Sequence, residues 1–162
     1  MKIKVNTLTT DIFLELYTSV GWEPTCREQV ECALKNTAAS FVAYEEEKAI
    51  GMVRIIGDGG MSFYIKDFAV LPGHQGKGVG QMLLMELQQY LLEHKPADWA
   101  VSLELISTKE AVGFYKKHGF EERACEWDVA QGPGNLGLRG PKRSVEPGMF
   151  KMVRNGDNLK IE

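Results

Sequence analysis

The sequence predicts an α/β (α+β) protein, with one mixed central sheet of about six to seven strands flanked by about four helices. The predicted elements run in the order strand, two helices, three strands, helix, strand, helix and two strands. The segment Gln81–His94 has apolar residues at three- and four-residue spacings, as an amphipathic helix does. This helix joins an apolar strand over Met61–Leu71 to a strand over Trp99–Ile106, and such a crossover between neighbouring parallel strands is right-handed.

The N-terminal part predicts one strand and two helices. Lys2–Asn6 alternates polar and apolar residues, which is typical of a short strand. A helix over Ile12–Val20 follows, with capping residues before it and a glycine after it. A second helix begins at Pro24 or Thr25 and ends near Asn36.

An antiparallel hairpin is expected next. Two strand-like runs, Ser40–Tyr44 and Ala49–Ile56, are separated by the charged turn Glu45–Lys48. We interpret the three glutamates of this turn as solvated, because consecutive residues of a tight turn point in different directions.

The C-terminal part predicts a helix and two more strands. Ser107 or Thr108 caps a helix that ends near His118 and is followed by a glycine. Strands are then expected over Phe120–Trp127 and Met149–Arg154.

Between these last strands, glycine and proline crowd the segment Asp128–Gly148. This pattern predicts a long connection, which is either a lid over a binding site or a disordered loop. We expect residues 1–154 to form a single domain and residues 155–162 to be a flexible C-terminal tail.

Composition and charge exclude several classes of protein. The 162 residues are 44% apolar and 25% charged, with a net charge of −3 and a pI of about 5.7. These values are typical of a globular protein and argue against nucleic acid or an anionic membrane as the partner. No apolar run is long enough to span a bilayer.

The cysteines and the N-terminus indicate a reducing compartment. Cys26, Cys32 and Cys125 are odd in number and form no Cys-x-x-Cys pair, so neither a disulfide framework nor a zinc site is expected. The first residues lack the apolar stretch of a signal peptide. We therefore expect a cytoplasmic protein without a bound metal.

The glycine-rich turn between the strand ending at Leu71 and the helix after it is the most informative segment. It reads Gly73-His74-Gln75-Gly76-Lys77-Gly78-Val79-Gly80. Backbone N–H groups at a helix start favour an anion, and glycines allow close approach to a phosphate. The turn therefore predicts a phosphate or pyrophosphate site.

Two phosphate-binding motifs do not fit. Lys77 is followed by Gly78 rather than by the serine or threonine of a nucleotide P-loop. The glycines are spaced as Gly-x-Gly-x-Gly, which is not the dinucleotide-binding fingerprint. A tight turn without any ligand remains an alternative.

Two longer segments resemble the GNAT superfamily of acyl-CoA N-acyltransferases. Gln75–Gly80 matches its (Arg/Gln)-x-x-Gly-x-(Gly/Ala) signature, after a strand exit, Asp67–Pro72, that is also similar. Glu110–Phe120 is similar to a second motif that ends in Phe-Tyr-x-x-x-Gly-Phe. The resemblance covers roughly residues 2–127 and implies a fold in which the fourth and fifth strands are parallel and splay apart.

The resemblance implies that acetyl-CoA is the co-substrate. Backbone groups of Phe68, Ala69 and Val70 would pair with the pantetheine arm. Thr108 stands where the family often has an asparagine that contacts pantetheine. The pyrophosphate would be held by N–H groups of Gln75, Gly76, Lys77, Gly78, Val79 and Gly80.

The reaction needs a proton acceptor and a proton donor, because an amine attacks only when neutral and a thiolate must leave. The resemblance assigns the donor to Tyr115, which could alternatively only pack against the sulfur. For the base, Asp67 and Glu104 lie on the two strands expected to flank the cofactor, and either could equally be structural.

For the acceptor, the resemblance indicates the first two helices, hence Tyr17, Trp22 and Glu23, whose acidic and aromatic character suits a cationic amine. The leading hypothesis is an enzyme that acetylates a small primary amine. The alternatives are a protein or peptide N-acetyltransferase and a non-catalytic CoA-binding sensor. A homodimer is compatible with the sequence.

Overall fold

The computed structural model describes residues 1–23, 25–122 and 147–156. The chain divides into two compact units. The first comprises Met1–Leu103 and Met152–Glu162, and the second comprises Glu104–Lys151.

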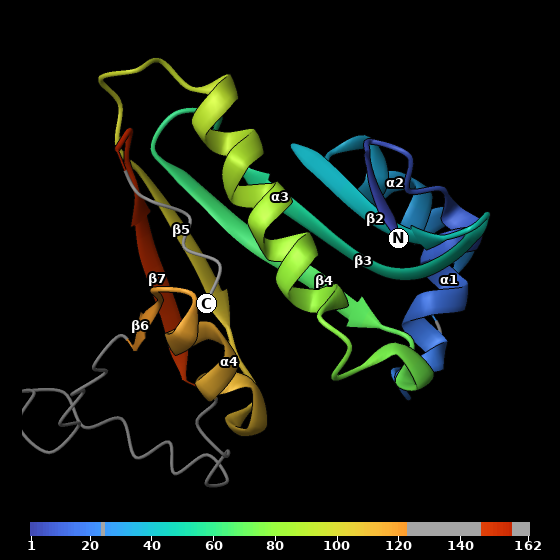
Figure 1. Ribbon diagram of the computed structural model, residues 1–162. Helices are drawn as coiled ribbons and strands as arrows, with labels where there is room; N and C mark the ends of the chain where they lie inside the picture. Colours follow the sequence, from blue (N-terminus) through green and yellow to red (C-terminus); the bar gives the residue numbers. More distant parts are fainter. Residues whose placement is uncertain (24, 123–146, 157–162) are drawn as a thin grey trace, which may run out of the picture. The chain divides into compact units, whose positions relative to one another are not determined.

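The first unit contains most of the sheet and three of the α-helices (Figure 1). Its elements follow the predicted order: β1 (Lys2–Val5), α1 (Thr10–Ser19), α2 (Arg27–Lys35), β2 (Ala39–Glu45), β3 (Lys48–Gly57), β4 (Ser62–Val70), the 3-10 turn η1 (Pro72–His74), α3 (Val79–His94) and the start of β5 (Val101–Ile106).

The second unit contains the rest of β5 and the elements that follow it. These are the 3-10 turn η2 (Lys109–Ala111), α4 (Val112–Lys117), β6 (Glu121–Glu122) and most of β7 (Gly148–Val153). β6 pairs with β7 in antiparallel register, with Glu121 opposite Phe150.

The strands form one seven-stranded mixed sheet in the order β1-β2-β3-β4-β5-β7-β6. β1 to β4 are antiparallel neighbours, whereas β4 and β5 run parallel. α3 connects these two parallel strands, so the crossover expected between 61 and 106 is confirmed.

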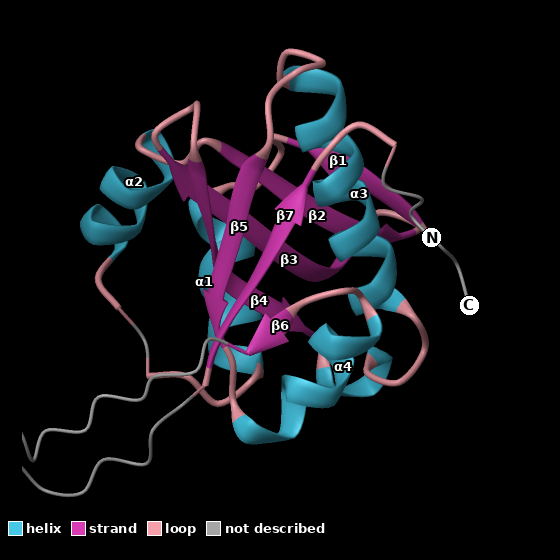
Figure 2. Cartoon of the chain, turned by 90° about the vertical axis from the view of Figure 1, so that its left-hand side faces the viewer, coloured by secondary structure: helices cyan, strands magenta, loops and turns pink. Residues whose placement is uncertain are grey.

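Helices cover both faces of this sheet in the first unit (Figure 2). Alternate residues of a strand point to opposite faces. On β2, Phe41 lies edge-on to Tyr90 of α3 at 5.5 Å, whereas Val42 and Tyr44 belong to the core beneath α1 and α2. That core also contains residues of both helices and of β3 and β4, namely Phe13, Leu16, Val30, Ala49, Met52 and Ala69.

The N-terminal end of α3 packs closely on β3 at Gly51. A Cβ built on Gly51 would lie 3.2 Å from the side chains of Val79 and Leu83 and from the backbone oxygen of Ala69. A larger residue would therefore displace the start of α3. This contact fixes where the helix begins relative to the end of β4.

β4 carries one more residue than β3 at a bulge. Met52 pairs with Ala69 and Arg54 pairs with Lys66, so Asp67 and Phe68 together lie opposite a single residue of β3. Asp67 has a φ of 50°, a left-handed conformation that aspartate tolerates better than most residues.

Two helices differ in extent from the sequence prediction. α2 begins at Arg27, because the Thr25 hydroxyl donates to Gln29 Oε1 at 2.8 Å instead of capping the backbone. The expected helix up to His118 begins as the 3-10 turn η2 and becomes α-helical only at Val112.

Other expectations concern segments that are described only in part. Of the strand expected over Phe120–Trp127, Glu121–Glu122 is described as β6, and residues 123–127 lie outside the described residues. Residues 128–146 of the expected long connection also lie outside them. Of the expected tail, Asn155 accepts a hydrogen bond from Lys95 at 3.1 Å, and residues 157–162 lie outside the description. Among the helices in the described ranges, none has the length and hydropathy of a membrane span.

Candidate active site

The glycine-rich turn leads from β4 into α3 through the 3-10 turn η1. Gly76 and Gly78 have φ values of +74° and +82°, and a Cβ at either position would meet nothing within 4 Å. Their conformation, not their surroundings, therefore requires glycine. Gly78 is the N-cap of α3 and supplies no side chain to cap the helix.

The backbone N–H groups of this turn point to an anion site. The His74 and Gln75 N–H groups donate to the carbonyls of Leu71 and Pro72. Further along the chain, the next backbone N–H found in a turn or helix-cap hydrogen bond is that of Met82, which donates to the Gly78 carbonyl at 3.0 Å. Within the described part of the chain, Gly76, Lys77 and Gly78 donate none of these bonds. The first N–H groups of α3 are also unpaired, as at any helix start. A pyrophosphate fits this donor set.

Two side chains hold the turn in place. Gln75 Nε2 donates to the Val70 carbonyl at 3.0 Å, which closes the turn onto the end of β4. His74 Nε2 lies 3.1 Å from Glu45 Oε2. Lys77 is exposed, so its ammonium group is available to a bound anion.

At the end of β4, the predicted pantetheine-binding residues continue the ladder with β3. Val70 pairs with Gly51 and Ala69 pairs with Met52, and the Leu71 N–H then donates to the Ile50 carbonyl at 2.9 Å. Asp67, a predicted candidate base, forms an ion pair with Arg54 of β3.

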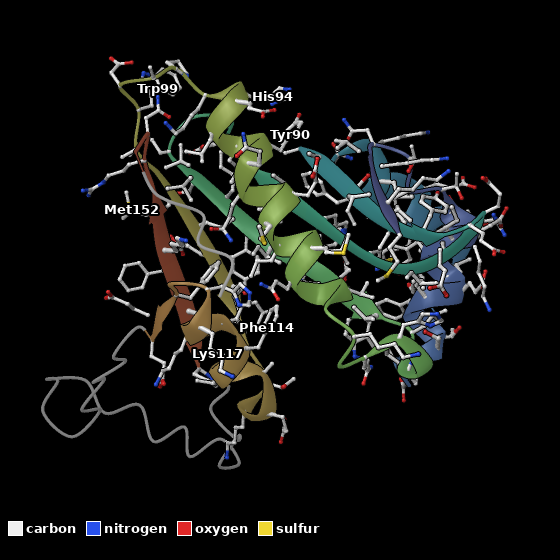
Figure 3. The ribbon with its side chains drawn as sticks, in the orientation of Figure 1. Tyr90, His94, Trp99, Phe114, Lys117 and Met152 are labelled. Atoms are coloured by element: carbon white, nitrogen blue, oxygen red, sulfur yellow. The ribbon has the colours of Figure 1, made fainter. Side chains whose placement is uncertain are left out.

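In the second unit, Tyr115 is buried on α4. Its ring lies 5.2 Å from that of Phe114, which Figure 3 labels, and 5.6 Å from that of Phe120. Burial raises the pKa of the Tyr115 phenol to about 12. Tyr115 is therefore protonated at neutral pH, as a proton donor must be.

This burial predicts a loss of stability at alkaline pH. The folded state holds the Tyr115 proton more tightly than the unfolded state, so the stabilisation is complete below about pH 10 and is lost by about pH 12. The full loss is about 3 kcal/mol in the free energy of unfolding. Chemical unfolding at a series of pH values should show this decline in the wild type and a shallower one in Tyr115→Phe.

A titration monitored at the tyrosinate absorbance provides the independent check. A late ionisation step is expected at the raised pKa of about 12, and Tyr115→Phe should remove that step. If Tyr115 ionised together with the others, the predicted decline would have no basis.

The other predicted residues of the second unit lie before α4. Glu104 is half-buried on β5. The Glu110 backbone N–H and then the Thr108 side chain lower the pKa of the Glu110 carboxyl through hydrogen bonds. The Thr108 hydroxyl is therefore engaged with Glu110 at the start of η2.

The predicted acceptor residues form an aromatic stack at the end of α1. Phe13 stacks on Tyr17 at 5.2 Å, and Tyr17 meets Trp22 edge-on at 4.8 Å. Trp22 remains 38% exposed and Glu23 beside it is exposed. The first unit thus has an exposed tryptophan at the end of this aromatic cluster, and an exposed glutamate follows it in the sequence.

Sequence reasoning missed two residues that the structure brings to these elements. Arg54 was included in an apolar strand, where a single charged residue is a signal of a buried partner. The second is His74, whose Nε2 lies within hydrogen-bond distance of Glu45 Oε2. That contact joins segments far apart in the sequence, and no local pattern indicates it.

Comparison with known proteins identifies the family. The model of the acetyltransferase (GNAT) domain matches residues 36–122, more than half of the chain. The chain belongs to the GNAT family of acetyltransferases, as the turn and the element order led us to expect.

Curated relatives are similar over part of their length. An uncharacterized N-acetyltransferase, ycf52, from Pyropia yezoensis is 30% identical over 110 residues, which are 65% of this chain and 61% of the relative. The histone acetyltransferase TAP1 from Glycine max is 31% identical over 113 residues, 63% of this chain and 47% of the relative. The chain thus spans about half to three fifths of the length of these relatives.

Solved structures share the fold. A probable acetyltransferase of unknown function from Staphylococcus aureus is 30% identical with a TM-score of 0.64, covering 81% of this chain and 96% of its own. An aminoglycoside 6'-N-acetyltransferase complexed with coenzyme A has a TM-score of 0.67 at 13% identity, covering 94% of this chain and 97% of its own. At that identity the likeness concerns the fold alone.

Proposed function

We propose that this protein is an N-acetyltransferase that moves an acetyl group from acetyl-CoA to a primary amine. The observation that carries the proposal is the set of N–H groups from Gly76 to the first turn of α3 that have no partner in the described loop and capping bonds. They belong to a turn that opens a long helix, where a pyrophosphate is the expected ligand. Family membership makes acyl-CoA the pyrophosphate compound that best fits.

Acetyl-CoA supplies an acetyl group activated as a thioester. We assign the binding of its pyrophosphate to the N–H groups of Gly76, Lys77, Gly78, Val79 and Gly80, whereas the Gln75 N–H already donates to the Pro72 carbonyl. Phe68–Val70 at the end of β4 would orient the pantetheine arm through backbone hydrogen bonds, and one of their N–H groups would face the thioester oxygen. The Thr108 hydroxyl is less available to contact pantetheine, because it is hydrogen-bonded to Glu110.

Two proton transfers complete the chemistry. We assign Glu104 as the group that takes a proton from the acceptor ammonium, directly or through water, because it is half-buried on β5, one of the two strands expected to flank the cofactor. We assign Tyr115 as the donor of the proton that the leaving sulfur accepts. Its burial keeps it protonated. The same burial would raise the pKa of a CoA thiol beside it, which reduces the difference between the pKa of the phenol and the pKa of the thiol.

For the acceptor, we propose a cationic amine that approaches the exposed face of Trp22. A cation within about 6 Å of an indole ring is attracted by its π face, and Glu23 adds a negative charge beside it. By their names, related proteins acetylate histones or aminoglycosides, and these acceptors carry amines. Cys26 and Cys32 are exposed free thiols, which favours a reducing compartment such as the cytoplasm.

The test is release of the CoA thiol from acetyl-CoA in the presence of a panel of primary amines, N-terminal peptides and lysine peptides. Thiol release with small amines supports the proposal, and preference for peptides would indicate a protein acetyltransferase. Tight binding of acetyl-CoA without turnover on any acceptor would contradict it and indicate a sensor.

A further inference from the structure

The bulge of β4 is held by a largely buried ion pair. Arg54 Nε donates to Asp67 Oδ2, and the two side chains are only 11% and 14% exposed. Each of the other ion pairs found in the described residues has at least one side chain more than half exposed. Of the ion pairs in the described residues, Arg54–Asp67 is therefore the least exposed, and charges removed from water require an oppositely charged partner.

The backbone of Asp67 explains why a side-chain contact is needed there. Its φ of 50° is unfavourable for a residue with a side chain, and Asp67 and Phe68 together lie opposite a single residue of β3. This peptide therefore departs from regular strand geometry. The contact to Arg54 ties it to the neighbouring strand.

Arg54 is itself held from a second side. Its Nη1 donates to Thr37 Oγ1 at 3.2 Å, and the Thr37 hydroxyl donates to the Ala33 carbonyl at 2.9 Å in the last turn of α2. A guanidinium carries donors in a fixed planar arrangement, so these two contacts define its orientation. The network runs from the C-terminal end of α2 through β3 to the bulge of β4.

We infer that Arg54 and Asp67 are positioning residues for the acyl-CoA site. By fixing the bulge, they set the direction of the backbone groups of Phe68, Ala69 and Val70, which follow it. Asp67 then acts through the backbone and not as the catalytic base. The inference rests on the proposed function, since the backbone groups that it positions are those assigned to pantetheine.

Asp67→Asn separates the two roles of this side chain. Asparagine tolerates a positive φ and its amide oxygen accepts the same hydrogen bond from Arg54, but it is no base. We expect kcat to stay within about 5-fold of the wild type with an unchanged pH profile, whereas loss of a general base lowers kcat by about 10²–10⁴-fold. A 100-fold lower kcat, with acetyl-CoA affinity unchanged and the acidic limb of the profile gone, would overturn the inference.

The double variant R54M/D67G removes both charges, so that neither is left buried alone, and glycine accommodates the positive φ. We expect it to fold, to raise KM for acetyl-CoA at least about 10-fold while kcat changes less, and to speed amide hydrogen exchange in β4 without any ligand. The matched control is R27M/D11N, which removes an exposed pair of the same unit and should behave as the wild type.

Exchange in the ligand-free protein separates this inference from the proposed function. If the wild type consumed no acetyl-CoA, the proposed function would fail, while the exchange rates would still show whether the pair fixes the bulge. Wild-type exchange together with wild-type KM in R54M/D67G would overturn the inference even if the enzyme is active.

Discussion

Gly78→Val is expected to weaken binding of acetyl-CoA by at least roughly 100-fold, or ~3 kcal/mol. Gly78 has a φ of +82°, where a β-branched side chain is strongly disfavoured. The turn would have to change its conformation, and the N–H groups of Gly76–Gly78 would be displaced. The added methyl groups would also occupy space on the side that is now open.

Gly59→Val is the matched control. Gly59 has a similar φ of +76° and equally open surroundings, but it lies in the turn before β4, whose nine residues separate it from the glycine-rich turn. Both variants should lose comparable stability in chemical unfolding, and Gly78→Val alone should lose binding in calorimetric titration. Equal loss of binding in both would mean that the effect is a general consequence of backbone strain.

Tyr115→Phe is expected to lower kcat by about 10²–10⁴-fold with little change in KM for acetyl-CoA. The substitution keeps the ring contacts with Phe114 and Phe120 and removes the hydroxyl group that carries the proton for the leaving sulfur. With a phenol pKa of about 12, transfer to an ordinary thiolate is uphill by ~5 kcal/mol. The rate of proton transfer from Tyr115 is therefore sensitive to how far the site raises the pKa of the CoA thiol.

Tyr90→Phe serves as the control for loss of a phenol elsewhere. Tyr90 lies on α3, where Figure 3 labels it, and its ring packs edge-on against Phe41. Steady-state kinetics should show wild-type kcat for this variant. Wild-type kcat in Tyr115→Phe as well would remove Tyr115 from the chemistry and leave it as a packing residue.

The fold could be predicted because its signals are local. Apolar periodicity and the glycine spacing between Leu71 and Gln81 defined the strand, the turn and the helix without knowledge of any distant contact. The helix boundaries were predicted less well, because a side chain near a helix end can bond either to the backbone or to another side chain. Thr25, for example, bonds to Gln29 and leaves the cap of α2 to Cys26.

The candidate site could be predicted only in part. The pairing of Arg54 with Asp67 depends on a register between two strands that includes an extra residue, and no sequence pattern specifies that register. Asp67 alone, on a strand beside the expected cofactor, therefore looked like a base. The pKa of Tyr115 depends likewise on burial, which is set by the tertiary fold.

Calorimetric titration with acetyl-CoA, with ATP and NAD as controls, tests the central claim that the turn from Gln75 to Gly80 binds the pyrophosphate of acyl-CoA. We predict a dissociation constant on the order of micromolar for acetyl-CoA and no comparable binding of ATP or NAD. Absence of acetyl-CoA binding, or equal binding of all three compounds, would contradict the claim.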